Sequence, residues 1–395
     1  MHTIRLKPRR EKSLLRRHPW VYASAIQDIT GSPGIGETVQ VNSSAGEFLA
    51  WGAYSPFSQI RLRIWSWEQS ETIDENFIRR RIDHSISLRK LLFDESLTTC
   101  VRLIHGESDG LPGLIVDRYG EILVVQFLSS GAEFWRNRIV ETLAKSAGIR
   151  YVFERSDADV RSLEGLPERI GPLLGGEPLD DSIILENGLR FRVNIRSGHK
   201  TGFYLDQRTN RLKIRSYTAG RDVLDCFSYT GGFSLNALQG NARSVLAIDA
   251  SAEALNLLAQ NLQLNQFSTE KVNCVEGDVF QVLRSFRDQR RTFDMIILDP
   301  PKFAPTISQV ERAARGYKDI NLLALKLLRP GGILCTFSCS GGVSPELFQK
   351  IVAAAAIDSE VDAQIIEHFH QDIDHPIGIN FPEGEYLKGL AIRKV

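Results

Sequence analysis

Residues 222–249 read DVLDCFSYTGGFSLNALQGNARSVLAID and contain the parts of a βαβ unit. An apolar strand at 223–225 enters a turn at 228–232, a helical pattern follows, and a second apolar strand at 245–248 ends at Asp249. An acid about 20 residues beyond a glycine turn is typical of α/β sheets that bind nucleotides. The stretch therefore predicts a parallel sheet that binds a ligand at the ends of its strands.

The turn favours a nucleoside ligand that lacks a pyrophosphate. Its glycines, Gly231 and Gly232, do not form the GxGxxG pattern of dinucleotide sites. Glycine lets a ligand approach the backbone closely, and Asp249 at the strand tip can accept both hydroxyls of a ribose. S-adenosylmethionine is a ligand of this kind, although a purely structural βαβ crossover would show the same pattern.

Strands and helices continue to alternate after this unit. Apolar strands at 272–276, 293–298 and 333–337 are separated by helical patterns, which predicts a doubly wound, Rossmann-like sheet. The tail, residues 368–395, is expected to add an antiparallel edge through a hairpin near Pro382 to Gly384.

Polar residues recur where these strands end, and parallel strands end at one edge of a sheet. We expect a ligand pocket there, because structural acids have little reason to recur at every strand exit. The residues at the strand ends are Asp225, Asp249, Asp278, Asp299 and Cys339.

Two smaller domains are expected before this sheet. Residues 1–70 show short alternating strands between glycines and prolines, which is typical of a β-rich domain. Residues 71–185 combine helical and strand patterns, and an Asn-Gly pair at 187–188 predicts a type I′ hairpin. The predicted fold class is therefore α/β, with domains at 1–70, 71–185 and 186–395.

The charge of the whole chain gives no hint of a polyanionic partner. The 48 Lys and Arg residues balance the 48 Asp and Glu residues, so an RNA surface must be a local patch. The stretch RLKPRREKSLLRRHPWVY, residues 5–22, places aromatic residues beside cations, which suits phosphate contact and base stacking. An ordinary solvated surface is the alternative. The candidates for RNA binding here are Arg9, Arg10, Arg16, Arg17 and Trp20.

A polar, glycine-containing segment, RSGHKTGFYLDQRTNR at 196–211, comes shortly before the βαβ unit. It could fold over the ligand, and we interpret Tyr204 and Gln207 as cofactor contacts and Arg208 as an RNA contact. A helix-capping loop with solvated charges is the alternative.

The five cysteines show no CxxC pair and no paired spacing with histidine. This pattern disfavours a zinc site or a disulfide framework, so we expect no metal and a reducing cytoplasm. No apolar run approaches membrane-spanning length, and the basic N-terminus lacks the apolar core of a signal peptide. A homodimer is compatible with the sequence, which leaves the oligomeric state open.

Asp299-Pro300-Pro301 and Cys339 together favour methylation of a base carbon. Cytosine C5 is a poor nucleophile, but a thiolate that adds to C6 converts the ring to an enamine. Cys339 is the candidate nucleophile, Asp299 could hydrogen-bond the ring, and Lys302 could favour the thiolate.

Other interpretations remain open. Cys339 alone would more often be a small buried residue, and an Asp-Pro-Pro motif also serves methylation of an exocyclic amine without any cysteine. A non-catalytic RNA-binding assembly factor with a relic pocket is the alternative outside enzymes.

The motifs DCFSYTGGFS, LDPPKF and FSCSGG, with KTGFYLDQR ahead of them, resemble the S-adenosylmethionine-dependent cytosine-5 methyltransferases of bacterial large-subunit rRNA. GETVQV and FLAWGAYSPFSQIRLRIW resemble the RNA-binding PUA domain of that family, so the resemblance covers essentially the whole chain. It implies 5-methylcytosine formation in 23S rRNA or its large-subunit precursor, with a PUA domain, a central α/β domain and a Rossmann-like methyltransferase domain.

The resemblance also implies roles for particular residues. Cys339 corresponds to the nucleophile of the family, and the cofactor residues are Asp225, Phe227, Ser228, Tyr229, Gly231, Asp249, Asp278 and Asp299. Other RNA cytosine-5 methyltransferases have a second cysteine in an Asp-x-Pro-Cys motif, where this chain has Lys302. Product release by a second thiol at that position is therefore not expected.

Overall fold

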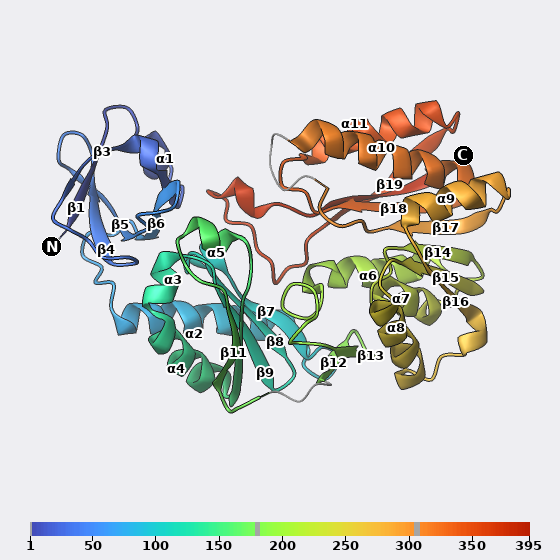
Figure 1. The fold of residues 1–395 in the computed structure, drawn as a ribbon, viewed down its shortest axis with the longest axis horizontal. Coiled ribbons are helices and arrows are strands. Elements are labelled where there is room, and N and C mark those ends of the chain that lie inside the picture. Colours follow the sequence, from blue (N-terminus) through green and yellow to red (C-terminus); the bar gives the residue numbers. More distant parts are fainter. Residues whose placement is uncertain (1, 178–181, 304–308) are drawn as a thin grey trace. The chain divides into compact units, whose positions relative to one another are not determined.

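The protein, represented by a computed structural model, is described over residues 2–177, 182–303 and 309–395, which group into two compact units (Figure 1). Unit 1 comprises Met1–Leu185, Val193–Leu205 and Ile373–Gly384. Unit 2 comprises Glu186–Arg192, Asp206–Asp372 and Glu385–Val395. Unit 1 thus joins the first two regions that the sequence divides, and the three-domain division stays a prediction.

The N-terminal part of unit 1 is a β-rich sheet, as predicted. Its strands lie in the order β2-β6-β5-β4-β1-β3, and alternate residues such as Ile4, Val39 and Leu62 are buried in one hydrophobic cluster. The strands are β1 (Thr3–Leu6), β2 (Trp20–Tyr22), β3 (Ile26–Thr30), β4 (Thr38–Asn42), β5 (Phe48–Tyr54) and β6 (Ile60–Ser66), with helix α1 at Lys12–Leu15. Alternation brings the side chains of this cluster to one face of the sheet, while Ala53 and Trp65 are buried in a second cluster with Phe77.

A second sheet of unit 1, in the order β11-β10-β9-β8-β7, carries helices α2 (Glu75–Leu92) and α4 (Arg136–Ala147). Phe77, Ile82 and Ile139 of these helices are buried against the strands. The strands are β7 (Cys100–His105), β8 (Leu114–Tyr119), β9 (Ile122–Phe127), β10 (Tyr151–Ser156) and β11 (Arg169–Leu174), and the short helices are α3 (Ser130–Phe134) and α5 (Val160–Leu163). This is the predicted central α/β sheet.

Residues Ile373–Gly384 belong to unit 1, although both flanking segments belong to unit 2. The buried Asp374 accepts from the backbone N–H of Arg102 at 2.8 Å, and Arg89 donates to its carbonyl oxygen at 3.1 Å. Near the other end, the Phe381 ring packs edge-on against Trp20 with centroids 4.9 Å apart. The predicted hairpin is confirmed, since β19 (Ala363–His370) and β20 (Lys388–Lys394) pair antiparallel and Pro382–Gly384 lie in the segment that joins them. The contacts of this segment with both sheets of unit 1 were not predicted.

Unit 2 is built on a mostly parallel sheet, in the order β16-β15-β14-β17-β18-β20-β19. The first five of these strands are parallel, whereas β20 runs antiparallel to both β18 and β19. The strands are β14 (Asp222–Cys226), β15 (Ser244–Asp249), β16 (Val272–Glu276), β17 (Phe293–Leu298), β18 (Leu328–Ser338), β19 (Ala363–His370) and β20 (Lys388–Lys394). The predicted doubly wound sheet with an antiparallel edge is confirmed.

Helices cover both faces of this sheet (Figure 1). One face buries Leu224, Ile296 and Leu334 against Leu283, Tyr317 and Phe348 of α9, α10 and α11. The helices of unit 2 are α6 (Arg208–Ile214), α7 (Gly232–Gln239), α8 (Ala252–Leu264), α9 (Val279–Asp288), α10 (Val310–Leu327) and α11 (Pro345–Asp358). Strands β12 (Ser182–Glu186) and β13 (Leu189–Val193) pair around Asn187 and Gly188, whose φ angles of 49° and 81° fit the predicted type I′ turn.

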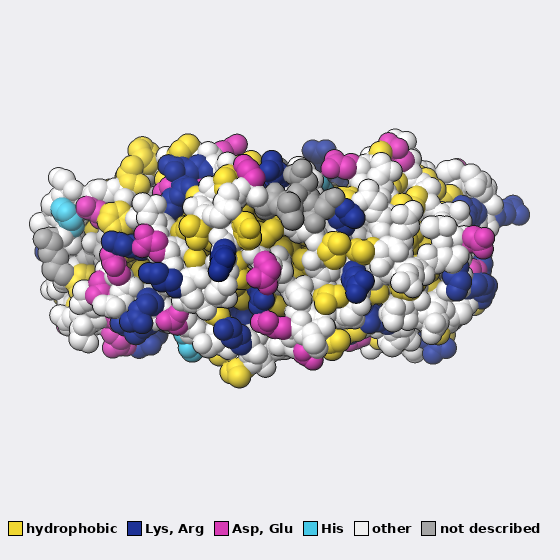
Figure 2. Space-filling view, turned by 90° about the horizontal axis from the view of Figure 1, so that it is seen from below, with side chains coloured by type: hydrophobic (Ala, Val, Ile, Leu, Met, Phe, Trp, Pro, Cys, Tyr) yellow, Lys and Arg dark blue, Asp and Glu magenta, His cyan; other side chains and the backbone are white. Residues whose placement is uncertain are grey.

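The surface carries both signs of charge. Figure 2 shows Lys and Arg side chains interspersed with Asp and Glu over the face in view, in keeping with the balanced composition. Within the described residues, no helix has the length and apolar character needed to cross a membrane.

Candidate active site

The turn after β14 has an unusual backbone. Phe227 and Tyr229 have φ angles of 63° and 49°, and Gly231 has a φ of 87°. The left-handed region is uncommon for residues other than glycine and costs about 1–3 kcal/mol per residue where bulky side chains occupy it. Hydrogen bonds hold the turn: Ser228 N donates to Ile248 O at 3.0 Å, and Gly231 N donates to Ser228 O at 2.9 Å. Such maintained strain is typical of functional sites.

The glycines of this turn also serve packing. A Cβ atom on Gly231 would lie 2.7 Å from Cγ of Leu258 on α8, and one on Gly232 would lie 2.9 Å from Cδ of Arg211 on α6. Asn261 of α8 donates to the Thr230 carbonyl at 3.0 Å. The two glycines therefore let α6 and α8 approach the turn, in addition to any close approach by a ligand.

Asp225 and Asp249 lie at the ends of neighbouring strands. Asp225 is fully buried, its Oδ2 accepts from Ser234 Oγ at 2.6 Å, and burial raises its pKa to about 7. The charges of Asp299 and Asp249 also contribute to this raised pKa. The Asp249 carboxylate accepts from the backbone N–H of Tyr229 at 2.8 Å and of Ser251 at 2.9 Å. The acid predicted to bind ribose thus also holds the turn.

Asp278 follows the end of β16, and Asp299 follows the end of β17. Gln207 donates through Nε2 to Asp299 Oδ1 at 2.9 Å, while its own Oε1 accepts from Asn210 at 2.6 Å. Asp278 is exposed and caps α9 by accepting from the backbone N–H of Gln281 at 3.0 Å. Backbone bonds join adjacent strand ends, since Gly277 N donates to Asp249 O at 2.9 Å. The predicted acids of unit 2 therefore share one edge.

Cys339 follows β18 at the same edge and is half-buried. Its neighbours Ser338 and Ser340 are fully buried, and the Tyr317 hydroxyl lies 3.0 Å from Ser340 Oγ. Cys226 and Cys335 are fully buried, and burial raises the pKa of both thiols, which disfavours their thiolates. Cys339 is thus better suited than either of them to act as a nucleophile at this edge.

Sequence reasoning missed one residue of this region, Lys388. Lys388, at the start of β20, donates to the carbonyl oxygens of Ser340 at 2.7 Å and Val343 at 2.6 Å. Lys302, which the sequence offered as the cation, is exposed. A lysine before an apolar run (KGLAI) is a weak signal, and only the β18–β20 pairing brings Lys388 to Ser338.

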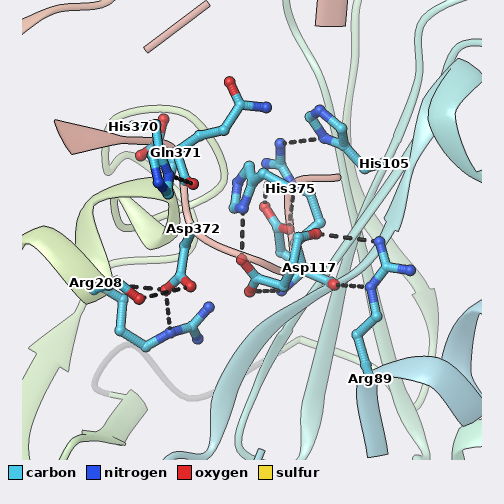
Figure 3. Close-up of polar contacts among 12 residues, drawn as sticks. Arg89, His105, Asp117, Arg208, His370, Gln371, Asp372 and His375 are labelled. Carbon is cyan, nitrogen blue, oxygen red and sulfur yellow. Dashed lines mark hydrogen bonds and ion pairs between the residues drawn. The ribbon is translucent and has the colours of Figure 1, made fainter. Parts of the chain in front are cut away.

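The remaining candidates of the 196–211 segment either belong to unit 1 or are buried in unit 2. Tyr204 belongs to unit 1, where its hydroxyl lies 3.0 Å from His199 Nδ1. Arg208 is only 2% exposed, and its Nε lies 2.7 Å from Asp372 Oδ2 (Figure 3). A buried, ion-paired arginine is poorly placed to contact RNA, which disfavours the predicted RNA contact of Arg208.

The N-terminal cations of unit 1 are accessible. Arg9, Arg10, Arg16 and Arg17 are all exposed. Trp20 is half-buried, and its Nε1 donates to Glu107 at 2.7 Å. The ring of Trp20 is therefore engaged within unit 1, whereas the four arginines face solvent.

The residues of the unit 2 edge fit a polar nucleoside ligand. Asp225 Oδ1, Ser228 Oγ and Thr230 Oγ1 are buried without a hydrogen-bond partner among the described residues. Buried polar atoms rarely stay unpaired, so a polar ligand at this turn would satisfy them. The described residues contain no group of three or more His, Cys, Asp or Glu arranged to hold a metal.

Comparisons with known proteins agree with this geometry. A family described as S-adenosylmethionine-dependent methyltransferase matches residues 141–380, and a PUA-like domain family matches residues 4–67. A protein of Shewanella amazonensis named ribosomal RNA large subunit methyltransferase I is 50% identical over 390 residues, with 99% of this chain and 98% of the relative covered. Its namesake in Citrobacter koseri is 49% identical over 384 residues, covering 97% of both chains.

Solved structures show the same fold. A chain from Streptococcus mutans, described as a SAM-dependent methyltransferase, superimposes with a TM-score of 0.86 at 22% identity, with both chains fully covered. A methyltransferase structure complexed with SAH gives a TM-score of 0.87 at 22% identity and the same coverage. The protein is a methyltransferase whose cofactor is S-adenosylmethionine. With 50% identity over nearly its whole length and matches to both domains, the chain belongs to the ribosomal RNA large subunit methyltransferase I family.

Proposed function

We propose that this enzyme methylates C5 of a specific cytosine in 23S rRNA or its precursor, through a covalent bond between Cys339 and C6 of the base. The observation that carries the proposal is that the half-buried thiol lies at the sheet edge where Asp225, Asp249 and Asp299 also lie. The relatives named for methylation of large-subunit rRNA support the choice of substrate.

The thiol solves a problem of reactivity. Cytosine C5 is too weak a nucleophile to take a methyl group directly, whereas addition of the Cys339 thiolate to C6 makes C5 an enamine carbon. S-adenosylmethionine supplies the electrophilic methyl group. A base then removes the C5 proton, the electrons of that C–H bond restore the C5–C6 double bond, and the thiolate leaves. The target base must be unpaired or flipped to reach the thiol.

The acids of the edge divide the remaining tasks. Asp299, held by Gln207 at 2.9 Å, is assigned to the N3 and N4 side of the cytosine ring. Asp249 is assigned to the ribose hydroxyls of the cofactor and Asp278 to its adenine amine. The turn residues Phe227, Ser228, Tyr229 and Gly231, with the buried Asp225, would surround the rest of the cofactor.

Lys302 and Tyr204 keep their predicted roles as proposals. The exposed Lys302 ammonium would meet substrate phosphate or support the thiolate. Tyr204 is assigned to the cofactor on the basis of the sequence alone. The base that accepts the C5 proton has no assignment.

The RNA surface is proposed at the N-terminal sheet of unit 1. Arg9, Arg10, Arg16 and Arg17 would contact phosphates, and the half-buried Trp20 would offer the free part of its ring to a base. A catalytic thiol needs a reducing compartment, which supports the cytoplasm as the site of action.

The test compares Cys339→Ala with Cys274→Ala, whose thiol is also solvent-accessible but lies on β16. We expect Cys339→Ala to lose methylation of rRNA while calorimetry still detects S-adenosylmethionine binding, and Cys274→Ala to stay active. RNA containing 5-fluorocytidine should trap wild-type enzyme in a complex that survives denaturant, because fluorine cannot leave C5 as a cation.

Retained turnover by Cys339→Ala would instead support methylation of an exocyclic amine. A wild-type protein that binds rRNA but releases no heat with millimolar S-adenosylmethionine would support the assembly-factor alternative. Mass mapping of rRNA from cells without the protein, compared with a complemented strain, would identify the nucleotide.

A further inference from the structure

Lys388 is a buried cation next to the proposed nucleophile. It is 6% exposed, and β20 pairs with β18 so that Lys388 lies opposite Ser338, one residue before Cys339. Lysine is rarely buried to this extent unless its ammonium group has partners. Here the partners are the carbonyl oxygens of Ser340 at 2.7 Å and Val343 at 2.6 Å.

These two bonds hold the loop that carries the thiol. Ser340 and Val343 are fully buried and lie one and four residues beyond Cys339 in sequence. The Tyr317 hydroxyl, 3.0 Å from Ser340 Oγ, contacts the loop from α10. The loop is therefore held by a hydroxyl from a helix and an ammonium group from a neighbouring strand.

We propose that Lys388 is a positioning residue that fixes the Cys339 loop and favours the thiolate through its positive charge. The inference rests on the proposed role of Cys339 as nucleophile. It differs from the assignment of Lys302 to the same task, because Lys302 is exposed and therefore screened by solvent. A buried cation acts more strongly on a neighbouring thiol than an exposed one.

The electrostatics of the cluster agree with this role. The pKa of Lys388 is lowered to about 8, mainly by burial and in part by Lys302, while the charges of Cys339 and Glu385 act in the opposite direction. An interaction between two charged groups is mutual, so the ammonium group stabilises the thiolate as much as the thiolate stabilises the ammonium group. On α10, burial raises the pKa of Tyr317, which keeps that hydroxyl neutral.

The test measures the ionisation of the thiol directly. The rate of Cys339 alkylation by iodoacetamide is followed against pH, with peptide mass mapping to separate it from the exposed Cys274. In wild-type enzyme we expect the alkylation rate of Cys339 to reach half of its maximum at a pH clearly below the pKa of about 8.5 of an ordinary cysteine. This pH is the alkylation midpoint. This arm needs no variant, and a midpoint at or above that value overturns the proposal.

Variants at position 388 separate charge from hydrogen bonding. Lys388→Met removes both, Lys388→Gln keeps a neutral donor, and Lys388→Arg keeps the charge. We expect Met and Gln to raise the alkylation midpoint by about one pH unit and Arg to leave it low. Melting curves identify any variant that does not fold, and for such a variant the wild-type midpoint decides.

Lys394 supplies a matched control. It lies on the same strand and donates to the carbonyl oxygens of Leu325 at 3.2 Å and Leu328 at 2.8 Å. Lys394→Met should leave the Cys339 midpoint unchanged. A folded Lys388→Met with the wild-type midpoint would contradict the role of Lys388.

The kinetic arm distinguishes this inference from the proposed function. At pH 7, Lys388→Met should lower kcat at least about tenfold with little change in KM for RNA, and the deficit should shrink as pH rises and the thiol ionises unaided. If Cys339→Ala remains active while the wild-type midpoint is low, the nucleophile assignment fails and the effect of Lys388 on the thiol stands.

Discussion

The backbone N–H of Tyr229 lies 2.8 Å from the carboxylate of Asp249, which also accepts from Ser251 at 2.9 Å. This acid therefore holds the strained turn after β14. If it also binds the ribose of the cofactor, as proposed, the two tasks are coupled, because a turn held in place would present its backbone to the cofactor in a single conformation.

Asp249→Asn should weaken S-adenosylmethionine binding by roughly thirtyfold, about 2 kcal/mol, through the loss of charged hydrogen bonds. Calorimetric titration measures the Kd, and melting without cofactor reports the turn. The control is Asp319→Asn on α10, an exposed acid that pairs with Arg284 of α9. An unchanged Kd in Asp249→Asn would remove this acid from the cofactor site.

Asp225 provides a pH-dependent test. Its pKa is raised to about 7 in the folded protein by burial, from 3.8 in the unfolded chain, so the folded state binds more protons between these values. The contribution of the protonated Asp225 carboxyl to the free energy of unfolding is fully present below pH 3.8 and is lost as the pH rises to 7. The free energy of unfolding of Asp225→Asn minus that of wild type should therefore be larger at pH 8 than at pH 5, by up to about 3 kcal/mol.

Thermal unfolding of both proteins without cofactor, at the two pH values, measures this difference. Asp222→Asn is the matched control, since hydrogen bonds from Arg329 and Ser244 outweigh burial and lower the Asp222 pKa below its usual value. The control should show the same stability difference from wild type at both pH values. The same result for Asp225→Asn would show that its burial does not favour the protonated form.

The βαβ unit and its strand-end acids could be predicted because their signals are local. Alternation of apolar residues, a glycine turn and an acid after each strand all occur within a few residues of one another. The outcome for Arg208 could not be predicted in this way. Its partner Asp372 lies 164 positions later in the chain, and without that carboxylate an arginine in a polar segment resembles a surface contact.

The connection between β19 and β20 shows the same limit. Pro382, Glu383 and Gly384 have the composition of a turn, which correctly predicts that the flanking strands pair. The contacts of the connection could not be predicted, because Asp374 and Phe381 join unit 1 through Arg102 and Trp20, more than 270 residues earlier. Lys388 was missed for the related reason that strand pairing, rather than local sequence, brings it to the Cys339 loop.

The exposed arginines of the N-terminal sheet predict a salt-dependent interaction with RNA. Replacing Arg9 and Arg10 with Gln should weaken rRNA binding and reduce the slope of log K against log salt by about 0.7–0.9 for each phosphate that no longer has an arginine partner. Filter binding between 50 and 200 mM salt, as an order-of-magnitude range, measures the slope. The control replaces Arg287 and Arg290, exposed residues at the end of α9 and just beyond it. Equal slopes for both double variants would place the RNA surface elsewhere.

Asp374 predicts how strongly Ile373–Gly384 stabilises unit 1. Its carboxylate is fully buried, accepts from Arg102 N at 2.8 Å and lies 2.6 Å from His375 Nδ1. Asp374→Ala removes the buried carboxylate that accepts these bonds, so the free energy of unfolding should be about 3 kcal/mol lower than in wild type. Denaturant unfolding measures this loss.

The control for Asp374 is Asp358→Ala, which breaks the exposed pair with Lys318 and should change stability by less than about 1 kcal/mol. A second readout is limited proteolysis of residues 373–384, which should become faster in Asp374→Ala as the segment leaves its sites in unit 1. If both variants unfold alike and the segment stays protected, Phe381 and the remaining contacts hold it without the carboxylate.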